Sequence, residues 1–241
     1  VRIRIPRVIR QIGTQRAGEV LLFSNIQDDA FLRYRIALAL SGIRLQHPEI
    51  VFDRTWALQA VDRRLESYRY YEPIFDRLAR YLPPNTLVIR TLRDRLEQNI
   101  EVTFRVLGLI YTHRTMMNIH QRLMSERGEN WSDAMELLDN IIDRDVRDRL
   151  FPILEHHLDL MGLSPAMPWE ASLDAVRAAL EELSESKDIL LRAATIHTRC
   201  QLGDDCAGRY PRLVEGRDTM NVMETVLFLE SVDIFRQNNL D

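Results

Sequence analysis

Apolar residues in the central part of the chain, from Leu87 to Glu155, recur with the spacing of one helix face. Four such stripes follow one another, each separated from the next by a few polar residues. They consist of Ile100, Phe104, Leu107 and Tyr111, then Met116, Ile119 and Leu123, then Met135, Leu138 and Ile142, and finally Val146, Leu150 and Ile153. Because the connections are too short for anything but antiparallel neighbours, this stretch predicts four amphipathic helices joined as hairpins.

The flanking regions show the same helical spacing between recognisable start and stop signals. Gly13 is expected to end a short first helix, and Thr14 and Asp53 each precede an apolar stripe as N-caps. Pro73 and Pro152 are expected to kink or restart the helices that contain them. No run alternates apolar and polar residues between turn signals, so we predict no sheet.

A degenerate internal repeat favours stacked hairpins over a closed bundle. Its copies are LLFSNIQDDAFLRYRIALAL, HQRLMSERGENWSDAMELL and LEELSESKDILLRAATIH, in which Arg33 and Arg192 are equivalent and Trp131 replaces them in the middle copy. Small residues in the second helix of each copy would let paired helices approach closely; they are Ala37, Ala134 and Ala194. Since one hairpin cannot bury its apolar face alone, neighbouring hairpins are expected to stack.

The expected organisation has one long helical region followed by a connection and a shorter helical part. Gly162, Pro165 and Pro168 mark the connection. The predicted boundaries are 1–157 for the helical repeats, 158–171 for the connection, 172–218 for a further helical repeat and 219–241 for a linker helix.

The composition is that of an ordinary soluble globular protein. With 46% hydrophobic and 28% charged residues, the chain is expected to be neither disordered nor embedded in a membrane. No apolar run approaches the roughly 18 to 20 residues of a membrane-spanning helix. The net charge of −4 is too small to indicate an acidic or basic partner for the chain as a whole. Because the sequence begins with Val1, we expect a segment of a longer polypeptide.

Several segments resemble the HEAT-repeat region of certain large bacterial membrane proteins. They are RIPRVIRQIGTQRAGEVLL, DDAFLRYRIALALSGIR, FRVLGLIY and AMELLDNIIDRDVRDRLFPILE. The resemblance covers most of residues 3–157 and, more loosely, 172–201. It implies an all-α fold, a HEAT-like α-α superhelix of stacked antiparallel helix hairpins. In that family a domain related to ATP/ADP translocases or the major facilitator fold precedes the repeats, and a cyclic-nucleotide-binding domain commonly follows them.

The end of the chain resembles the leading helix of such a nucleotide-binding domain. The segment in question is METVLFLESVDIF, residues 223–235. The β-roll and the phosphate-binding arginine of that domain are not found before Asp241, so we expect no small-molecule ligand and no cofactor in this segment. The resemblance therefore implies a non-catalytic cytoplasmic scaffold that links a transporter-like membrane domain to a cyclic-nucleotide-binding-like sensor. Its partners would be neighbouring domains of the same polypeptide or another protein.

Arginines gather at the start of the chain without any acidic residue among them. They are Arg2, Arg4, Arg7, Arg10 and Arg16. If a membrane domain precedes them, the positive-inside bias and anionic lipid headgroups would both favour their contact with the membrane surface. The alternative is a solvated helix face near the edge of the domain, and the residues do not favour one over the other.

One cluster has the residue types of a metal site, formed by His197, Cys200 and Cys206 with Asp204 and Asp205 nearby. A structural zinc site requires four ligands, usually in tighter pairs, and here the fourth would be a carboxylate. We therefore favour a buried Cys200 and an incidental loop cysteine, and predict no metal site. Two cysteines also favour a reducing compartment over a disulfide framework.

Histidines are the other candidate catalytic residues. They are His113 and His120, and the adjacent pair His156 and His157. The pair is expected to interact with a helix C-terminus. Replacement of both histidines by alanine is expected to matter much less to folding than Leu138→Asp in the third stripe. The chain has no HExxH, GxSxG, P-loop or GxGxxG motif, and no pattern of converging acid and base. We therefore predict no catalytic residues.

An aromatic and basic cluster could stack on single-stranded nucleic acid. It contains Tyr68, Tyr70 and Tyr71 with Arg63, Arg64 and Arg69, interleaved with Asp62, Glu66 and Glu72. Because the acidic residues cancel much of its positive field, we favour packing between hairpins and predict no nucleic-acid partner.

Two alternatives to the scaffold remain: a free-standing HEAT-type adaptor that binds a protein in its groove, and a metal-binding or enzymatic helical protein.

Overall fold

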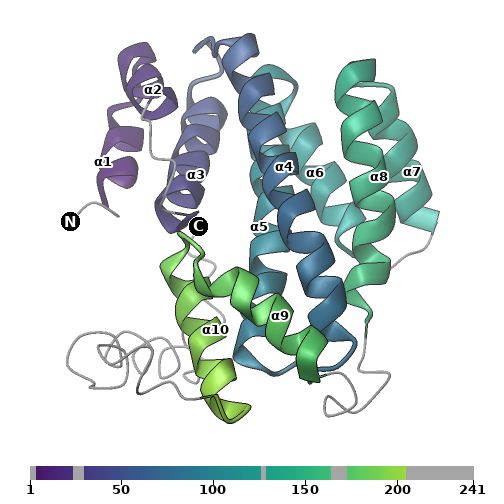
Figure 1. Ribbon diagram of the computed structural model, residues 1–241. Coiled ribbons are helices and arrows are strands. Elements are labelled where there is room, and N and C mark those ends of the chain that lie inside the picture. The colour runs from purple at the N-terminus through teal and green to yellow at the C-terminus, as the bar shows by residue number, and fades with distance from the viewer. Residues whose placement is uncertain (1–3, 24–29, 126–128, 164–172, 205–241) are drawn as a thin grey trace.

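The computed structural model describes residues 4–23, 30–125, 129–163 and 173–204, and within these ranges the chain is helical without any strand (Figure 1). The prediction of an all-α fold is therefore confirmed. The helices are α1 (Ile5–Ile12), α2 (Gln15–Leu22), α3 (Ala30–Gln46), α4 (Arg54–Ala79), α5 (Leu87–Ile110), α6 (His113–Leu123), α7 (Glu129–Asp139), α8 (Arg144–Met161), α9 (Leu173–Ser184) and α10 (Ile189–Gln201).

The expected helix signals are found where the sequence places them. The Thr14 hydroxyl accepts a hydrogen bond from the Ala17 amide (3.2 Å), and the Asp53 carboxylate accepts one from the Trp56 amide (2.6 Å). Gly13 ends α1 with φ at 60°, a conformation that a side chain would strain. These caps satisfy amides that have no partner within their own helices.

The long antiparallel helices α4 and α5 form the centre of the molecule. Both prolines that were expected to kink or restart a helix lie inside continuous helices, Pro73 in α4 and Pro152 in α8, so the predicted restarts are wrong. A proline removes one backbone hydrogen bond. In α4, Pro73 is followed directly by Ile74 and Phe75, both fully buried. The burial of these two side chains favours continuation of the helix beyond the proline.

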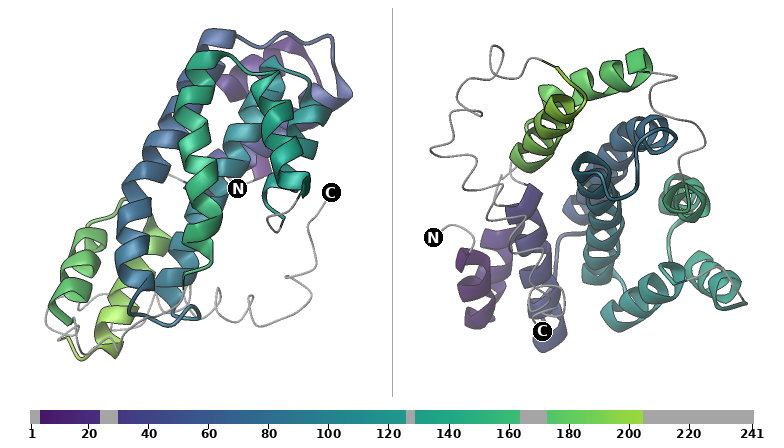
Figure 2. Two further views of the ribbon diagram at one scale, coloured as in Figure 1. Left: turned by 90° about the vertical axis from the view of Figure 1, so that its right-hand side faces the viewer. Right: turned by 90° about the horizontal axis from the view of Figure 1, so that it is seen from below.

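The remaining helices form three groups around this central hairpin (Figure 2). The first group, α1 to α3, packs on α5 through α3; the second, α6 to α8, packs on α5 through α6 and on α4 through α8. The third group, α9 and α10, returns to the centre, with α9 against α4 and α10 against α5. In a strictly linear stack each hairpin contacts only its neighbours, so this return is an additional feature of the chain. The HEAT-like superhelix itself stays a prediction.

The core follows the apolar stripes of the sequence. All residues of the four central stripes are buried except Tyr111, which is partly buried against the same core. The alanines of the internal repeat, Ala37, Ala134 and Ala194, are buried as well. A second, smaller core of α2 and α3 with Leu109 of α5 attaches the N-terminal group to the centre.

Two boundary predictions meet the described part of the chain. Helix α8 runs through residues 158–161, which the sequence assigned to the connection, because Leu160 is buried on its apolar face. The start of the expected repeat at 172, its end beyond 204 and the linker helix over 219–241 lie outside the described residues.

Candidate functional site

A half-open cavity of about 640 Å³ lies between α3 and α4. Helix α5 packs against both of these helices and forms the floor of the gap between them. Pockets of about 300–1,000 Å³ are typical of small-molecule sites. The lining residues are Leu21, Leu22, Phe23, Arg33, Ile36, Ala37, Leu40, Trp56, Ala60, Arg63, Arg64, Glu66, Ser67, Tyr70, Val102 and Val106.

Helical spacing explains which side chains enter the cavity. On α3, Arg33, Ala37 and Leu40 lie one turn apart, and on α4 the residues Trp56 and Ala60 are four apart. Ala37 on α3 and Ala60 on α4 both line the cavity, and their small side chains leave space between the helices. The result is an apolar interior with a basic end.

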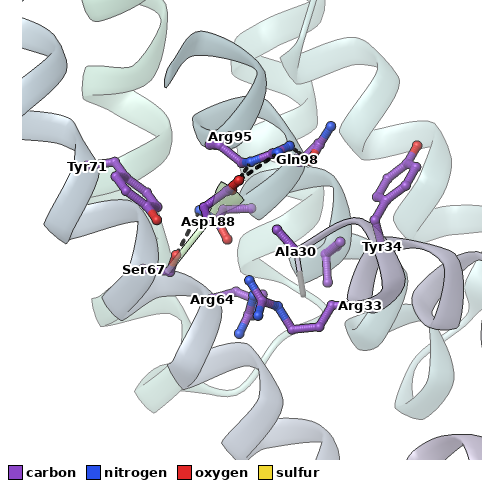
Figure 3. Close-up of a pocket in the computed structure, with 11 residues that line it drawn as sticks. Ala30, Arg33, Tyr34, Arg64, Ser67, Tyr71, Arg95, Gln98 and Asp188 are labelled. Atoms are coloured by element: carbon purple, nitrogen blue, oxygen red, sulfur yellow. Dashed lines mark hydrogen bonds and ion pairs between the residues drawn. The ribbon is translucent and has the colours of Figure 1, made fainter. Parts of the chain in front are cut away.

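A smaller pocket of about 20 Å³ adjoins the basic end and shares Arg33, Arg64, Ser67 and Val102 with the cavity (Figure 3). Its volume is sufficient for about one water molecule. Its wall is polar: Asn99 donates a hydrogen bond to the Ser67 hydroxyl (3.2 Å). The guanidinium groups of Arg33 and Arg64 lie side by side at the junction of the two spaces.

Arg64 lies in unfavourable electrostatic surroundings. Burial, together with the nearby charges of Arg33 and Arg63, lowers the pKa of Arg64 to about 10. No carboxylate of the described residues forms an ion pair with Arg64. A largely buried cation beside two like charges is costly unless an anion compensates it.

The carboxylates that line these spaces do not neutralise Arg64. The Asp188 carboxylate lies 2.5 Å from Nε of Arg95. It also accepts hydrogen bonds from the backbone amides of Leu190 and Leu191 at the start of α10. Glu66, at the mouth of the cavity, is exposed to solvent. Among the described residues, no carboxylate at the junction therefore compensates the charge of Arg64.

His157 is not at a helix end, as the sequence suggested, but inside α8, where it is 2% exposed. Its Nδ1 lies 3.0 Å from the Tyr68 hydroxyl, which is fully buried on α4. Burial lowers the pKa of His157 to about 4, with a smaller contribution in the same direction from His120 and His156. His157 is thus a neutral core residue that connects α8 to α4, and its burial argues for a larger role in folding than the sequence suggested.

The other histidines are not brought together around a cavity. His120 packs against Phe104 with ring centroids 5.3 Å apart, and His156 is exposed, 3.5 Å from Glu72. Neither of the two spaces described above is lined by a histidine.

The suspected metal cluster receives no support within the part of the chain that the structure describes. No group of three or more His, Cys, Asp or Glu residues is arranged there to hold a metal ion. Cys200 is exposed and disulfide-bonded, so the expected buried, free cysteine is not found there. Asp204 is paired with Arg177 (3.1 Å) and Arg199 (2.8 Å), while Asp205 and Cys206 lie outside the described residues.

The aromatic and basic cluster on α4 is divided between several neighbours. Tyr68 is in the core, Tyr71 is packed against it, and Arg69 donates to the Arg149 carbonyl on α8 (3.1 Å). Only Tyr70 of the three tyrosines is exposed. This distribution agrees with packing between helices, the interpretation favoured from the sequence.

A second candidate surface lies on α1, where the apolar side points away from the molecule. Ile5, Val8 and Ile12 occupy one face of this short helix and are 47%, 57% and 59% exposed. Val20 and Phe23, on and directly after α2, are also exposed. We name these five side chains the N-terminal apolar surface. A run of exposed apolar side chains on neighbouring elements is unusual for a surface that faces only water.

The N-terminal arginines differ in their contacts. Arg4 and Arg7 are exposed, and Arg16 is near Glu19 (3.4 Å). Arg10 packs on Gly42 of α3, where a Cβ atom would lie 2.2 Å from the Arg10 side chain. Arg10 therefore holds α1 in place, whereas Arg4 and Arg7 remain directed to solvent beside the apolar face. Arg2 lies outside the described residues.

Comparisons of the chain with protein-family models, with curated proteins and with solved structures give no match. None of the described helices combines the length and the apolar character needed to cross a membrane.

Proposed function

We propose that this chain is a non-catalytic, HEAT-like helical scaffold whose N-terminal apolar surface docks a neighbouring domain of the same polypeptide. The observation that carries the proposal is the outward apolar face of α1, with Ile5, Val8 and Ile12 in the solvent. The terminal unit of a helical stack normally presents a polar outer face to water, so an apolar outer face is expected to be covered by another element. The sequence resemblance supports a transporter-like membrane domain as the neighbour before the repeats and a cyclic-nucleotide-binding-like sensor after them, on the cytoplasmic side.

A scaffold of this kind would transmit the state of the sensor through the central hairpin. Helix α10, near the end of the described chain, packs on α5, which also contacts α3 of the N-terminal group. Movement at the sensor end could therefore reach the N-terminal group through one rigid helix. No chemical step is required of the chain itself.

The test compares the 241-residue chain with the natural full-length polypeptide by amide hydrogen exchange and mass spectrometry. In the longer protein, docking should slow exchange in α1 and α2 by about ten-fold or more. The double variant Val8→Glu, Ile12→Glu should restore fast exchange, because charges at these positions cannot be buried in the contact. The matched control Ile189→Glu, at an exposed apolar position on α10, should not.

Three other outcomes would contradict the docking proposal. Equal exchange of α1 and α2 in both proteins would show that no domain covers the surface. Protection only in the presence of anionic vesicles would assign the surface to the membrane. A natural polypeptide that ends near both boundaries of this chain would leave a free-standing adaptor.

A further inference from the structure

We propose that the cavity between α3 and α4 binds a small amphiphile with one acidic head, whose head lies at Arg64 and whose apolar chain lies along the cavity. This proposal goes beyond the scaffold function and does not depend on it. It also departs from the sequence-based expectation that the segment has no small-molecule ligand.

The acidic head is inferred from the charges at the junction of the two spaces. The Arg64 guanidinium is largely enclosed, is next to Arg33, and has no ion pair among the described residues. A guanidinium offers two parallel N–H donors, which match the two oxygens of a carboxylate or the oxygens of a phosphate. The Ser67 hydroxyl lines the same junction and is a further donor or acceptor.

The apolar chain is inferred from the rest of the lining. Ile36, Leu40 and Val106 line the cavity but not the small pocket at the arginines, and none of the three carries a polar side-chain atom. The cavity is half open and measures about 640 Å³, so a flexible chain can enter without unfolding a helix. A fully hydrophilic anion would leave this apolar surface in contact with water, and a fully apolar ligand would leave Arg64 uncompensated.

The first experiment is a calorimetric titration of the 241-residue chain with decanoate, decyl phosphate and uncharged decanol. We expect decanoate or decyl phosphate to bind at least ten-fold more tightly than decanol. In Arg64→Gln, binding of the acidic ligand should weaken at least ten-fold, while decanol binding stays within two-fold. The control Arg114→Gln changes an exposed arginine on α6, away from the cavity lining, and should leave both affinities unchanged.

A second variant tests the cavity itself. Ala60→Leu adds three carbon atoms inside the space and should weaken decanoate and decanol alike. If Arg64 stabilises the fold and does not bind a ligand, Arg64→Gln should lower the melting temperature. If Arg64 binds an anionic ligand, removal of its charge should leave the melting temperature of the ligand-free protein equal or higher.

Two results would overturn the proposal. The first is equal affinity of the wild type and Arg64→Gln for the acidic ligands, which includes the absence of binding by both. The second is binding to phosphatidylglycerol vesicles without binding of monomeric decanoate or decyl phosphate, which would show a membrane surface as the source of the anion. The cavity lining meets the N-terminal apolar surface only at Phe23, and none of the substituted residues belongs to that surface, so neither result bears on docking there.

Discussion

His157 shows how one side chain can make the stability of this fold depend on pH. Its imidazole is buried beside the Tyr68 hydroxyl, and burial lowers its pKa to about 4. In the unfolded chain the imidazole takes up a proton near pH 6.5. The unfolded state therefore binds more protons between these two values, and the stabilising contribution of neutral His157 is lost as the pH falls from about 6.5 to about 4.

We expect the free energy of unfolding to fall by about 2 kcal/mol between pH 7 and pH 5 because of His157 alone. In His157→Gln, which retains a polar partner for Tyr68 but does not titrate, this part of the decrease should disappear. Urea denaturation at both pH values measures it. The control His156→Gln changes the adjacent, exposed imidazole and should keep the decrease; an equal pH dependence in wild type and His157→Gln would refute the assignment.

Arg64 and His157 also show which properties of single residues are readable from the sequence. Both residue types were visible in the sequence, inside clusters of aromatic, basic or histidine residues. Their surroundings were not, because Arg64 meets Arg33 from another helix and His157 meets Tyr68 across α4 and α8. Helical spacing fixes the face on which a residue lies, but not the residue that faces it.

Helix α7 provides a direct test of the apolar stripes at the scale of one element. Leu138 is 0% exposed and its neighbour Leu137 is 39% exposed. Leu138→Asp should lower the free energy of unfolding by about 4 kcal/mol, because it buries an unpaired carboxylate. Leu137→Asp introduces the same group at the exposed position and should cost less than about 1 kcal/mol. Similar melting temperatures for the two variants would show that the burial pattern of α7 is wrong.

The attachment of α10 to α5 includes a buried ion pair between Arg95 and Asp188. Both side chains are 9% exposed, and Asp188 is at the same time the N-cap of α10. Removal of one partner leaves the other buried and uncompensated. Arg95→Met should therefore destabilise the protein by about 3 kcal/mol.

A double-mutant cycle separates this ion pair from the packing of the Arg95 side chain. Asp188→Asn keeps the capping oxygen but removes the charge. The double variant Arg95→Met, Asp188→Asn should recover at least about 1 kcal/mol of the sum of the single losses. Additive losses in urea denaturation would mean that the two groups do not interact, contrary to the structure.

For the whole molecule, apolar periodicity was sufficient to predict the helices and their buried faces, as the four central stripes show. It did not predict the return of α9 and α10 to the central hairpin, because periodicity shows which face of a helix is apolar but not which other helix covers it. The ion pair between Arg95 and Asp188, far apart in the chain, was equally unpredictable. The cavity could not be predicted from the sequence either, since its lining comes from α3, α4 and α5 together. Sequence patterns describe one element at a time, whereas a cavity is a property of several.

The distribution of burial predicts a gradient of stability across the molecule. Helices α1 and α2 have eight residues each, and α1 buries only Pro6. Helices this short are not stable alone and depend on tertiary contacts. Helices α4 and α5, by contrast, carry the largest buried side chains of the core, among them Tyr68, Phe75 and Phe104. In the 241-residue chain, amides of α1 and α2 should exchange at least about 100-fold faster than those of α4 and α5.

Amide hydrogen exchange of the chain alone measures this gradient and also interprets the docking experiment. If α1 and α2 exchange rapidly alone and slowly in the longer polypeptide, the added protection must come from the element that covers the N-terminal apolar surface. If they are already as protected as α4 and α5 in the chain alone, the exposed face of α1 does not weaken it, and the gradient is refuted. Helix α10 is the internal reference, because its capped and ion-paired start should give it intermediate protection in both proteins.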